Sequence, residues 1–341
     1  MRALIATVAA VLLVVVVAAA GGTSPQPVIA YSQIRTIAQI ELYVTGPDGP
    51  HVVGTGQEPS VAPDGLLVSG SALGSVGPAL TLYATATKRS YSFFNDRVSV
   101  TPLAWSPDSR YLAVLLQMDH RQIISTGLAV IDTTTMTART IATGDIRGAS
   151  FAPSGPDRLV YGQARSEQIE DAVNLYTVNP DGSDRRQVTT DGGSVRPLWT
   201  ARGIVYDRET RLGVGLAPAY QLWLLHGAHS TQLTHLTAPA RVAGLIPVAA
   251  SANGNRLIAE YEGPGAFTPS AVQLSPRRVD ALATAGTDTQ GAGISPDGRT
   301  VLIVRGPVGN SIFGKRFVET VPFGGGRPTR IAAGNDAAWN G

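Results

Sequence analysis

The chain has 341 residues, no cysteine and a formal net charge of +2. Without cysteine it can form no disulfide and no thiolate metal site, and it has neither a cysteine nucleophile nor a lipid-modified N-terminal cysteine. The excess of positive charge is small, and the basic residues form no clustered stripe of the kind that a nucleic-acid-binding protein presents, so we expect no nucleic-acid partner.

The N-terminal residues have the pattern of an export signal. Arg2 precedes an uncharged stretch rich in Leu, Val and Ala, and Ala18-Ala19-Ala20 offer the small residues that a signal peptidase recognises. We therefore predict a signal peptide at residues 1–20, a linker at residues 21–27 and an extracytoplasmic remainder that is secreted or periplasmic. The apolar stretch is also long enough to remain as a membrane anchor. In that alternative this segment is the only membrane contact, and the rest of the chain faces outward.

One short phrase recurs along the rest of the chain. Its fullest copy is AWSPDSRYLAV at residues 104–114, and a second copy is GISPDGRTVLI at residues 293–303. With a third copy and several degenerate ones, the spacing is roughly 43 to 52 residues, which is close to that of propeller blades. The copies begin at Val61, Ala104, Phe151, Trp199, Ser251 and Gly293.

Each copy predicts a β-hairpin. An apolar strand leads into Pro-Asp-Gly, which forms a turn because Pro restricts φ and Gly accepts a positive φ, and a second apolar strand follows. Two more strands are predicted in each unit, for example at residues 172–178 and 186–189, on either side of a turn at residues 179–183. Four short strands per unit without helical periodicity predict an all-β propeller.

The repeat resembles that of TolB-like and WD-like β-propellers. The family pattern W-S-P-D-G-R, followed later by D-G and by Leu/Val-Thr, is matched at residues 104–114, at Asp181-Gly182 and at residues 185–189. The resemblance covers nearly all of residues 27–341 and implies a single β-propeller at residues 28–341, without the separate N-terminal domain that TolB carries. TolB's partner and role are not carried over, because a shared fold does not determine function.

The strand count predicts about seven four-stranded blades. Residues 28–54 provide three strands, whereas residues 335–341 resemble the first strand of a further repeat. We therefore predict that the C-terminal strand completes the first blade, since this arrangement pairs two otherwise exposed sheet edges.

Several catalytic and metal-binding patterns are missing or incomplete in the sequence. It contains no G-x-S-x-G nucleophile elbow, and its P-loop-like segment at residues 309–315 continues with Arg316 where magnesium binding needs Ser or Thr. Three histidines and two acidic segments fall in predicted turns, strand ends or solvated loops. We therefore predict no catalytic residue, no metal site and no cofactor. The alternatives are a zinc site at the histidines and a calcium site at the acidic turn. These residues are His226, His229 and His235, then Asp181 to Asp184, then Glu167, Glu170 and Asp171.

Four successive repeats place an arginine just before or at their first strand. In a propeller this position lies near the mouth of the central channel, so four guanidinium groups there would form a ring suited to an anionic ligand or an acidic partner loop. The residues are Arg97, Arg147, Arg196 and Arg241.

These observations predict a monomeric, non-enzymatic propeller that acts as a protein–protein interaction or scaffold module. Its channel mouth and its longest loops, at residues 162–171 and 207–218, would meet an unidentified envelope or secreted protein, because loops on a rigid scaffold commonly carry recognition. Two alternatives are a small-ligand sensor and an enzyme of the lactonase or lyase type with its site in the channel.

Overall fold

The computed structural model describes the chain from residue 28 to residue 340 with several gaps. The described ranges are residues 28–36, 39–46, 48–72, 78–95, 98–120, 123–164, 172–210, 219–235, 244–263, 266–282, 287–307 and 315–340. These ranges contain 28 β-strands and no α-helix, so the predicted all-β class is confirmed. Within them no helix is long and apolar enough to cross a membrane. The predicted export signal and linker, residues 1–27, lie outside the described residues.

The strands form antiparallel sheets, and the first four sheets have four strands each. The first contains β28 (Asp336–Trp339), β1 (Ile29–Thr36), β2 (Gln39–Gly46) and β3 (Gly49–Thr55). The second contains β4 (Gln57–Val61), β5 (Leu67–Ser71), β6 (Leu80–Ala84) and β7 (Ser90–Phe93). The third contains β8 (Ser99–Trp105), β9 (Tyr111–His120), β10 (Ile123–Asp132) and β11 (Thr137–Thr143). The fourth contains β12 (Ile146–Phe151), β13 (Leu159–Ala164), β14 (Val173–Val178) and β15 (Arg186–Gln187).

The next sheet has eight strands, and the last sheet again has four. The eight strands are β16 (Ser194–Thr200), β17 (Gly203–Thr210), β18 (Ala219–His226), β19 (His229–Gln232), β20 (Gly244–Ala250), β21 (Arg256–Gly263), β22 (Ala266–Leu274) and β23 (Arg277–Ala281). A single parallel bridge between Tyr220 and Gly244 joins its two four-stranded halves. The last sheet contains β24 (Thr287–Ile294), β25 (Thr300–Pro307), β26 (Phe317–Pro322) and β27 (Thr329–Ala333).

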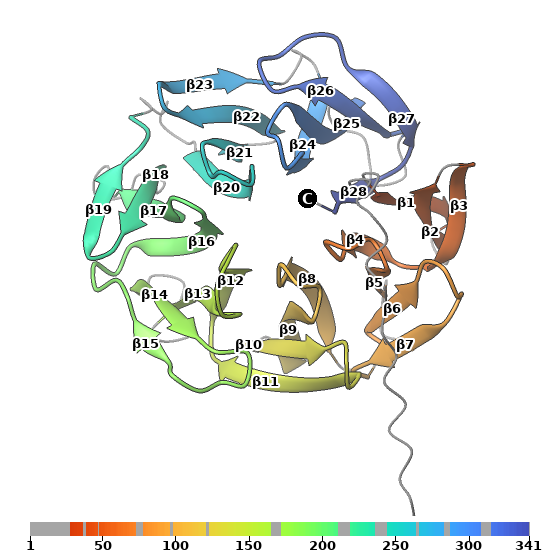
Figure 1. The fold of residues 1–341 in the computed structure, drawn as a ribbon, viewed down its shortest axis with the longest axis horizontal. Coiled ribbons are helices and arrows are strands. Elements are labelled where there is room, and N and C mark those ends of the chain that lie inside the picture. Colours follow the sequence, from red (N-terminus) through yellow and green to blue (C-terminus); the bar gives the residue numbers. More distant parts are fainter. Residues whose placement is uncertain are drawn as a thin grey trace, which may run out of the picture.

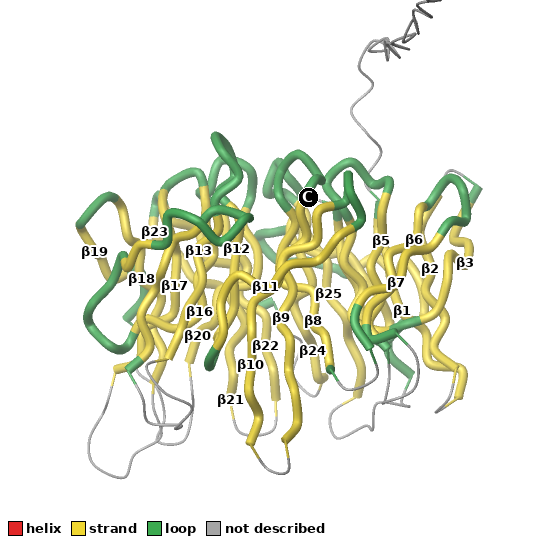
Figure 2. The backbone as a smooth tube through the Cα atoms, turned by 90° about the horizontal axis from the view of Figure 1, so that it is seen from below, coloured by secondary structure: helices red, strands yellow, loops and turns green. Residues whose placement is uncertain are grey.

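The sheets follow one another around a central axis (Figure 1). One strand from each four-stranded unit lies nearest the axis, and we call these the inner strands: β28, β4, β8, β12, β16, β20 and β24. Seen from the side, the strands run between two ends of the ring (Figure 2). We call the end where the inner strands begin the entry end, and the end with the hairpin turns that follow them the turn end.

Apolar side chains pack between neighbouring sheets. On β2, Ile40, Leu42 and Val44 are buried and alternate with more exposed residues, which is the period of a strand with one face against a core. A typical cluster joins Leu82 of the second sheet with Leu112 of the third. The sheets, and the inner strands with them, are therefore held in place by packing between neighbouring sheets.

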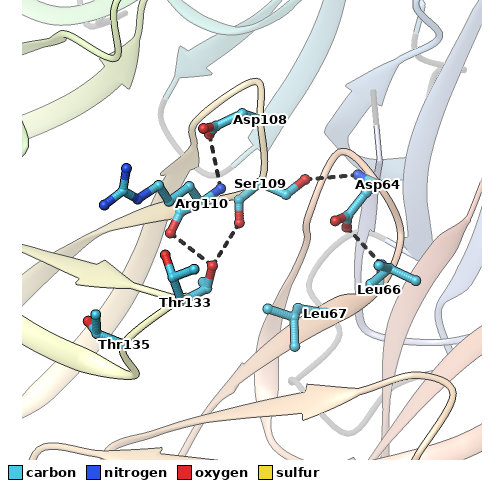
Figure 3. Close-up of a pocket in the computed structure, with 9 residues that line it drawn as sticks. Asp64, Leu66, Leu67, Asp108, Ser109, Arg110, Thr133 and Thr135 are labelled. Carbon is cyan, nitrogen blue, oxygen red and sulfur yellow. Dashed lines mark hydrogen bonds between the residues drawn. The ribbon is translucent and has the colours of Figure 1, made fainter. Parts of the chain in front are cut away.

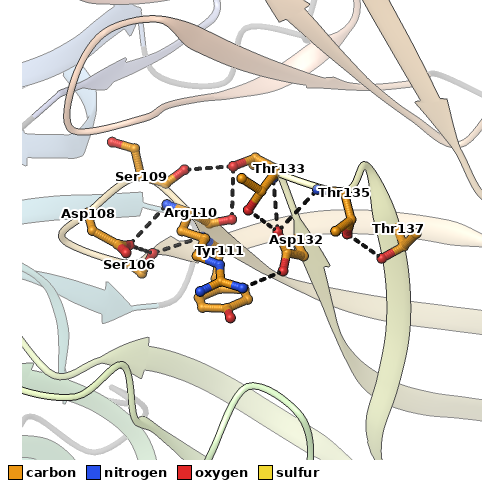
Figure 4. A network of polar contacts seen from close by, with 10 residues as sticks. Ser106, Asp108, Ser109, Arg110, Tyr111, Asp132, Thr133, Thr135 and Thr137 are labelled. Carbon is orange, nitrogen blue, oxygen red and sulfur yellow. Dashed lines mark hydrogen bonds and ion pairs between the residues drawn. The ribbon is translucent and has the colours of Figure 1, made fainter. Parts of the chain in front are cut away.

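The recurring phrase forms a self-contained hydrogen-bonded turn (Figure 4). Ser106 Oγ donates to Asp108 Oδ1 at 2.6 Å, and the Arg110 amide donates to the same oxygen at 3.0 Å. The Tyr111 amide donates to Ser106 Oγ at 2.8 Å. The same three bonds recur in the copy at residues 295–300. The phrase therefore recurs because its side chains stabilise the turn, as Asp and Ser commonly do.

The C-terminal strand lies in the first sheet, beside β1. Residues Ile29 to Ser32 pair in antiparallel register with Trp339 to Asp336. Two side chains add to this pairing: the Val28 amide donates to Asn340 Oδ1 at 2.7 Å, and Ser32 Oγ donates to Asp336 Oδ2 at 3.1 Å. Residues 312 positions apart in sequence are thus joined directly.

Candidate functional site

Two acidic residues from neighbouring inner strands lie near each other at the entry end. Asp336 opens β28, and Glu58 is the second residue of β4. Asn340 and Ala62 are the residues that follow the two inner strands. Asp336 lies four residues before Asn340 and Glu58 four residues before Ala62, so the two acidic residues occupy the same place in the repeat. The Glu58 amide donates to Asp336 Oδ2 at 3.5 Å, and the same oxygen accepts the bond from Ser32 Oγ.

The surroundings of Glu58 raise the pKa of its carboxyl above the usual value. Burial among the surrounding strands is the largest cause, and the negative charge of Asp336 acts in the same direction. A hydrogen bond with Thr101 of β8 opposes both effects. The residue as a whole nevertheless keeps an exposed surface, so solvent reaches it while its charged form is disfavoured. An accessible carboxyl with a raised pKa beside a second carboxylate is a common acid/base arrangement.

The backbone at Glu58 is unusual for a residue with a side chain. Its φ is 49°, in the left-handed region, and it lies where the pairing of β4 with β5 shifts register between Gln57 and Ser60. Such a backbone costs about 1–3 kcal/mol and is concentrated at functional sites. At the same place in other repeats stand Pro102, Gly148 and Gly291, which carry no charge.

The described residues provide no cation for this pair. None of their Arg, Lys or His side chains forms an ion pair with Glu58 or Asp336. Among the described residues, the two acidic groups thus lie together without a printed ion pair.

Two of the four predicted ring arginines lie within the described residues, on the neighbouring inner strands β12 and β16. Arg147 forms an ion pair with Asp145, with 2.5 Å between Nη2 and Oδ2, and its side chain is 40% exposed. Arg196 packs across from Gly148, because a Cβ added to that glycine would lie 3.7 Å from Arg196 Cγ. Arg97 and Arg241 lie outside the described residues, so the four-membered ring stays a prediction.

Arg196 is tied to a buried carboxylate. Asp207 of β17 is 0% exposed and accepts the Arg196 amide at 2.6 Å and its Nε at 2.9 Å, while Nη2 lies 2.8 Å from Oδ2. Burial raises the pKa of Asp207, and the charge and hydrogen bonds of Arg196 act to lower it. The guanidinium of Arg196 is thus occupied in holding this carboxylate, whereas that of Arg147 is more exposed and pairs with a less buried carboxylate.

The other residues singled out from the sequence do not assemble a site. His226 and His229 face each other across the β18–β19 hairpin, and His226 Nδ1 lies 3.0 Å from the Arg202 carbonyl oxygen. In the part of the chain that the structure describes, no group of three His, Asp or Glu side chains is placed to hold a metal ion. Asp181 Oδ1 accepts from the Ser183 amide at 2.9 Å, as in an ordinary turn. The acidic loop at residues 165–171 and all of the P-loop-like segment except Lys315 lie outside the described residues.

No protein-family model matches the chain, and no curated protein matches its sequence. Among solved structures, TolB from Acinetobacter baumannii is similar over 92% of this chain and 66% of its own, with a TM-score of 0.53 and 15% identity. The fold is that of a TolB-like β-propeller. This chain spans slightly less than two thirds of that TolB chain.

Enzymes share the same fold. An oligogalacturonate lyase solved with manganese is similar over 78% of this chain and 79% of its own, with a TM-score of 0.58 and 13% identity. A puromycin-hydrolyzing peptidase from Mycobacterium tuberculosis is similar over 89% of this chain and 53% of its own, with a TM-score of 0.59 and 14% identity. The described residues of this chain do not fit manganese, because two carboxylates are the most that they bring together at the channel mouth.

These neighbours correct the expectation of a non-enzymatic scaffold. That expectation depended on the lack of catalytic motifs in the sequence, yet lyases and peptidases occur among the propellers that this chain resembles. A motif requires catalytic residues close together in the sequence. In a propeller the catalytic residues can come from separate inner strands, so no short sequence pattern identifies them.

Proposed function

We propose that the protein is an exported propeller enzyme that uses Glu58 and Asp336 as an acid/base pair at the entry end of its channel. The observation that carries this proposal is the contact of the Glu58 backbone amide with the Asp336 carboxylate, together with the raised pKa of Glu58, to which the charge of Asp336 contributes. Two neighbouring carboxyls in different environments can act as acid and base in one reaction. Export is supported by the signal-like pattern of residues 1–20.

The chemistry that fits best is an elimination on a small carboxylated sugar. Asp336 removes the proton from the carbon next to the substrate carboxylate, the electrons of that C–H bond form a double bond, and the C–O bond to the leaving sugar breaks. Protonated Glu58 donates its proton to the departing oxygen. Arg147, on β12 across the axis from β4 and β28 (Figure 1), supplies a guanidinium for the substrate carboxylate.

The coverage of the structural neighbours supports a lyase more than a peptidase. The two oligogalacturonate lyases match this chain over 79% and 87% of their own lengths, so a chain of this size can contain such an enzyme's whole site. The peptidases match over about half of theirs.

We propose further that the sheets form seven blades and that β28 closes the first. The single bridge between Tyr220 and Gly244 supports counting the eight-stranded sheet as two blades. The four paired positions between β1 and β28 support closure by the C-terminal strand.

Incubation of the full chain with oligogalacturonates tests the function, with the ultraviolet absorbance of the unsaturated product as readout. Glu58→Gln and Asp336→Asn are expected to lower the rate at least a hundredfold, in the range typical of lost acid/base groups. Asp297→Asn, at the turn end, is the matched control and keeps the native rate. Activity should fall as pH rises through the pKa of Glu58, because the acid must be protonated. No product from the native chain, or equal rates in Glu58→Gln, would contradict the proposal.

A further inference from the structure

The turn end of the last three four-stranded units, from β16 to β27, carries an excess of positive charge. Six arginines lie in its hairpin turns or at the first residues of the strands that follow them. Among the described residues of the same turns and strand starts, the carboxylates are Asp280 on β23 and Asp297 in the β24–β25 turn. We call the six arginines the basic arc: Arg202, Arg256, Arg277, Arg278, Arg299 and Arg327.

Most of the basic arc is exposed, and half of it has no acidic partner. Arg256 is half-buried, and the other five arginines are exposed. Arg278 Nε lies 2.6 Å from Asp280 Oδ2, and Arg299 Nε lies 3.7 Å from Asp297 Oδ2. Such exposed ion pairs are weak. Within the described part of the chain, no carboxylate pairs with the remaining exposed members, Arg202, Arg277 and Arg327.

Hydrogen bonds join three turns of the basic arc into one surface. Arg202 Nη1 donates to Asn255 Oδ1 at 2.8 Å, which links the β16–β17 turn to the β20–β21 turn. Arg256 Nη1 donates to the Gly298 carbonyl oxygen at 3.0 Å, which links β21 to the β24–β25 turn. The inner strands β16, β20 and β24 follow one another around the ring (Figure 1). The positive charges are therefore held along one continuous stretch of the turn end.

The turn end of the second and third sheets carries both signs of charge. A cavity of about 600 Å³ lies there, and Asp64, Asp108 and Arg110 are among the residues that line it (Figure 3). Arg110 is already paired, because its Nη2 lies 3.1 Å from Asp132 Oδ2. The turns of the fourth sheet carry three further aspartates beside their arginines: Asp157, Asp181 and Asp184. The excess of positive charge is thus confined to the basic arc.

The chain enters the ring at this same end. Ile29, the first residue of β1, pairs with Trp339, the last residue of the inner strand β28, so β1 begins at the turn end. The linker predicted at residues 21–27 can span at most about 25 Å, because an extended chain advances about 3.3–3.6 Å per residue. The apolar stretch before that linker is long enough to cross a membrane. A membrane that holds this stretch therefore lies close to the turn end.

We propose that the basic arc binds the phosphate groups of an anionic lipid surface, with the entry end facing away from the membrane. Guanidinium groups bind phosphate through paired, charge-assisted hydrogen bonds. Each arginine near an anionic lipid surface strengthens binding by about fivefold. In this orientation the channel mouth with Glu58 and Asp336 stays open to a dissolved substrate.

Fluorescence quenching by vesicle lipids tests which end of the ring meets the membrane. The chain has no cysteine, so one introduced cysteine carries a dye at a chosen place in the full chain. Gly324→Cys places the dye in the β26–β27 turn, where an added Cβ meets no atom within 4 Å, and Gln39→Cys places it at the entry end. The vesicles contain phosphatidylcholine, alone or in equal parts with phosphatidylglycerol, and a brominated lipid as quencher.

The dye at position 324 is expected to be quenched strongly in the vesicles with phosphatidylglycerol and much less in those with phosphatidylcholine alone. The quenching should fall in about 1 M salt, where the screening length is about 3 Å. The dye at position 39 should not be quenched in either kind of vesicle. Equal quenching of the two dyes, or equal quenching of the dye at position 324 in both kinds of vesicle, would overturn the proposal.

Paired variants decide whether the basic arc is responsible. Arg277→Gln/Arg327→Gln removes two unpaired charges and should lower the affinity for phosphatidylglycerol vesicles about tenfold or more. Lys88→Gln/Arg89→Gln removes the same charge from the β6–β7 turn and should leave the affinity unchanged, as should Glu58→Gln, so the result does not depend on the proposed enzymatic activity. An equal loss in Lys88→Gln/Arg89→Gln would contradict the assignment to the arc. Binding of heparin without binding of these vesicles would also overturn it, because the arc would then recognise a soluble polyanion.

Discussion

Replacement of Arg196 by alanine should destabilise the protein strongly, whereas the same change at Arg147 should not. Arg196 makes three contacts with Asp207, which is completely buried. The variant keeps the bond from the backbone amide but leaves a buried carboxylate without its cation, which costs about 3–5 kcal/mol. Arg147 holds the partly exposed Asp145 with a side chain that is itself 40% exposed, and such pairs contribute about 1 kcal/mol or less.

Urea unfolding followed by the fluorescence of the four tryptophans measures both free energies of unfolding. In Arg196→Ala we expect the pKa of Asp207 to lie above its value in the unfolded chain. The loss in free energy of unfolding should therefore be largest at neutral pH and should shrink as pH falls towards about 3.9, where the carboxyl is protonated. Arg196→Ala/Asp207→Asn should recover part of the lost stability, because it removes the buried charge. If Arg196→Ala and Arg147→Ala lowered the free energy of unfolding equally, the Arg196 guanidinium would not stabilise the buried Asp207 carboxylate, and its structural role would be disproved.

Three further changes test other parts of the structure. Asp157→Asn should stabilise the protein at neutral pH, because the raised pKa of Asp157 means that its ionisation opposes folding. This gain in stability should disappear below about pH 4, where Asp157 is protonated in both the folded and the unfolded state, and urea midpoints measured across pH test it. Gly162→Ala should cost about 1–3 kcal/mol, because the new Cβ would lie 1.9 Å from the Val195 carbonyl oxygen, whereas Gly324→Ala meets no atom within 4 Å and should be neutral in the same thermal unfolding assay. Deletion of residues 336–341 should cost more than about 3 kcal/mol, because it removes the pairing with β1 and the packing of Trp339; an unchanged melting temperature would disprove closure by this strand.

Much of the architecture could be predicted because its signals are local. The bonds of the Ser106 turn span five residues, so the phrase that makes them is visible in the sequence and recurs wherever the turn recurs. Counting strands predicted that residues 335–341 add a strand to the first unit, and β28 does pair with β1. The apolar alternation of strands such as β2 belongs to the same local class of signal.

The candidate site was decided by the tertiary structure. Glu58 and Asp336 are 278 residues apart, and nothing near either one in the sequence marks them as partners. The ring brings the two inner strands together, and the positive φ at Glu58 turns its amide towards Asp336. Asp207 likewise gives no sign in the sequence that it is buried or that Arg196 is committed to it. Turns are encoded by bonds between near neighbours, whereas burial, shifted pKa values and paired charges depend on which sheets pack together, and only the folded ring determines that.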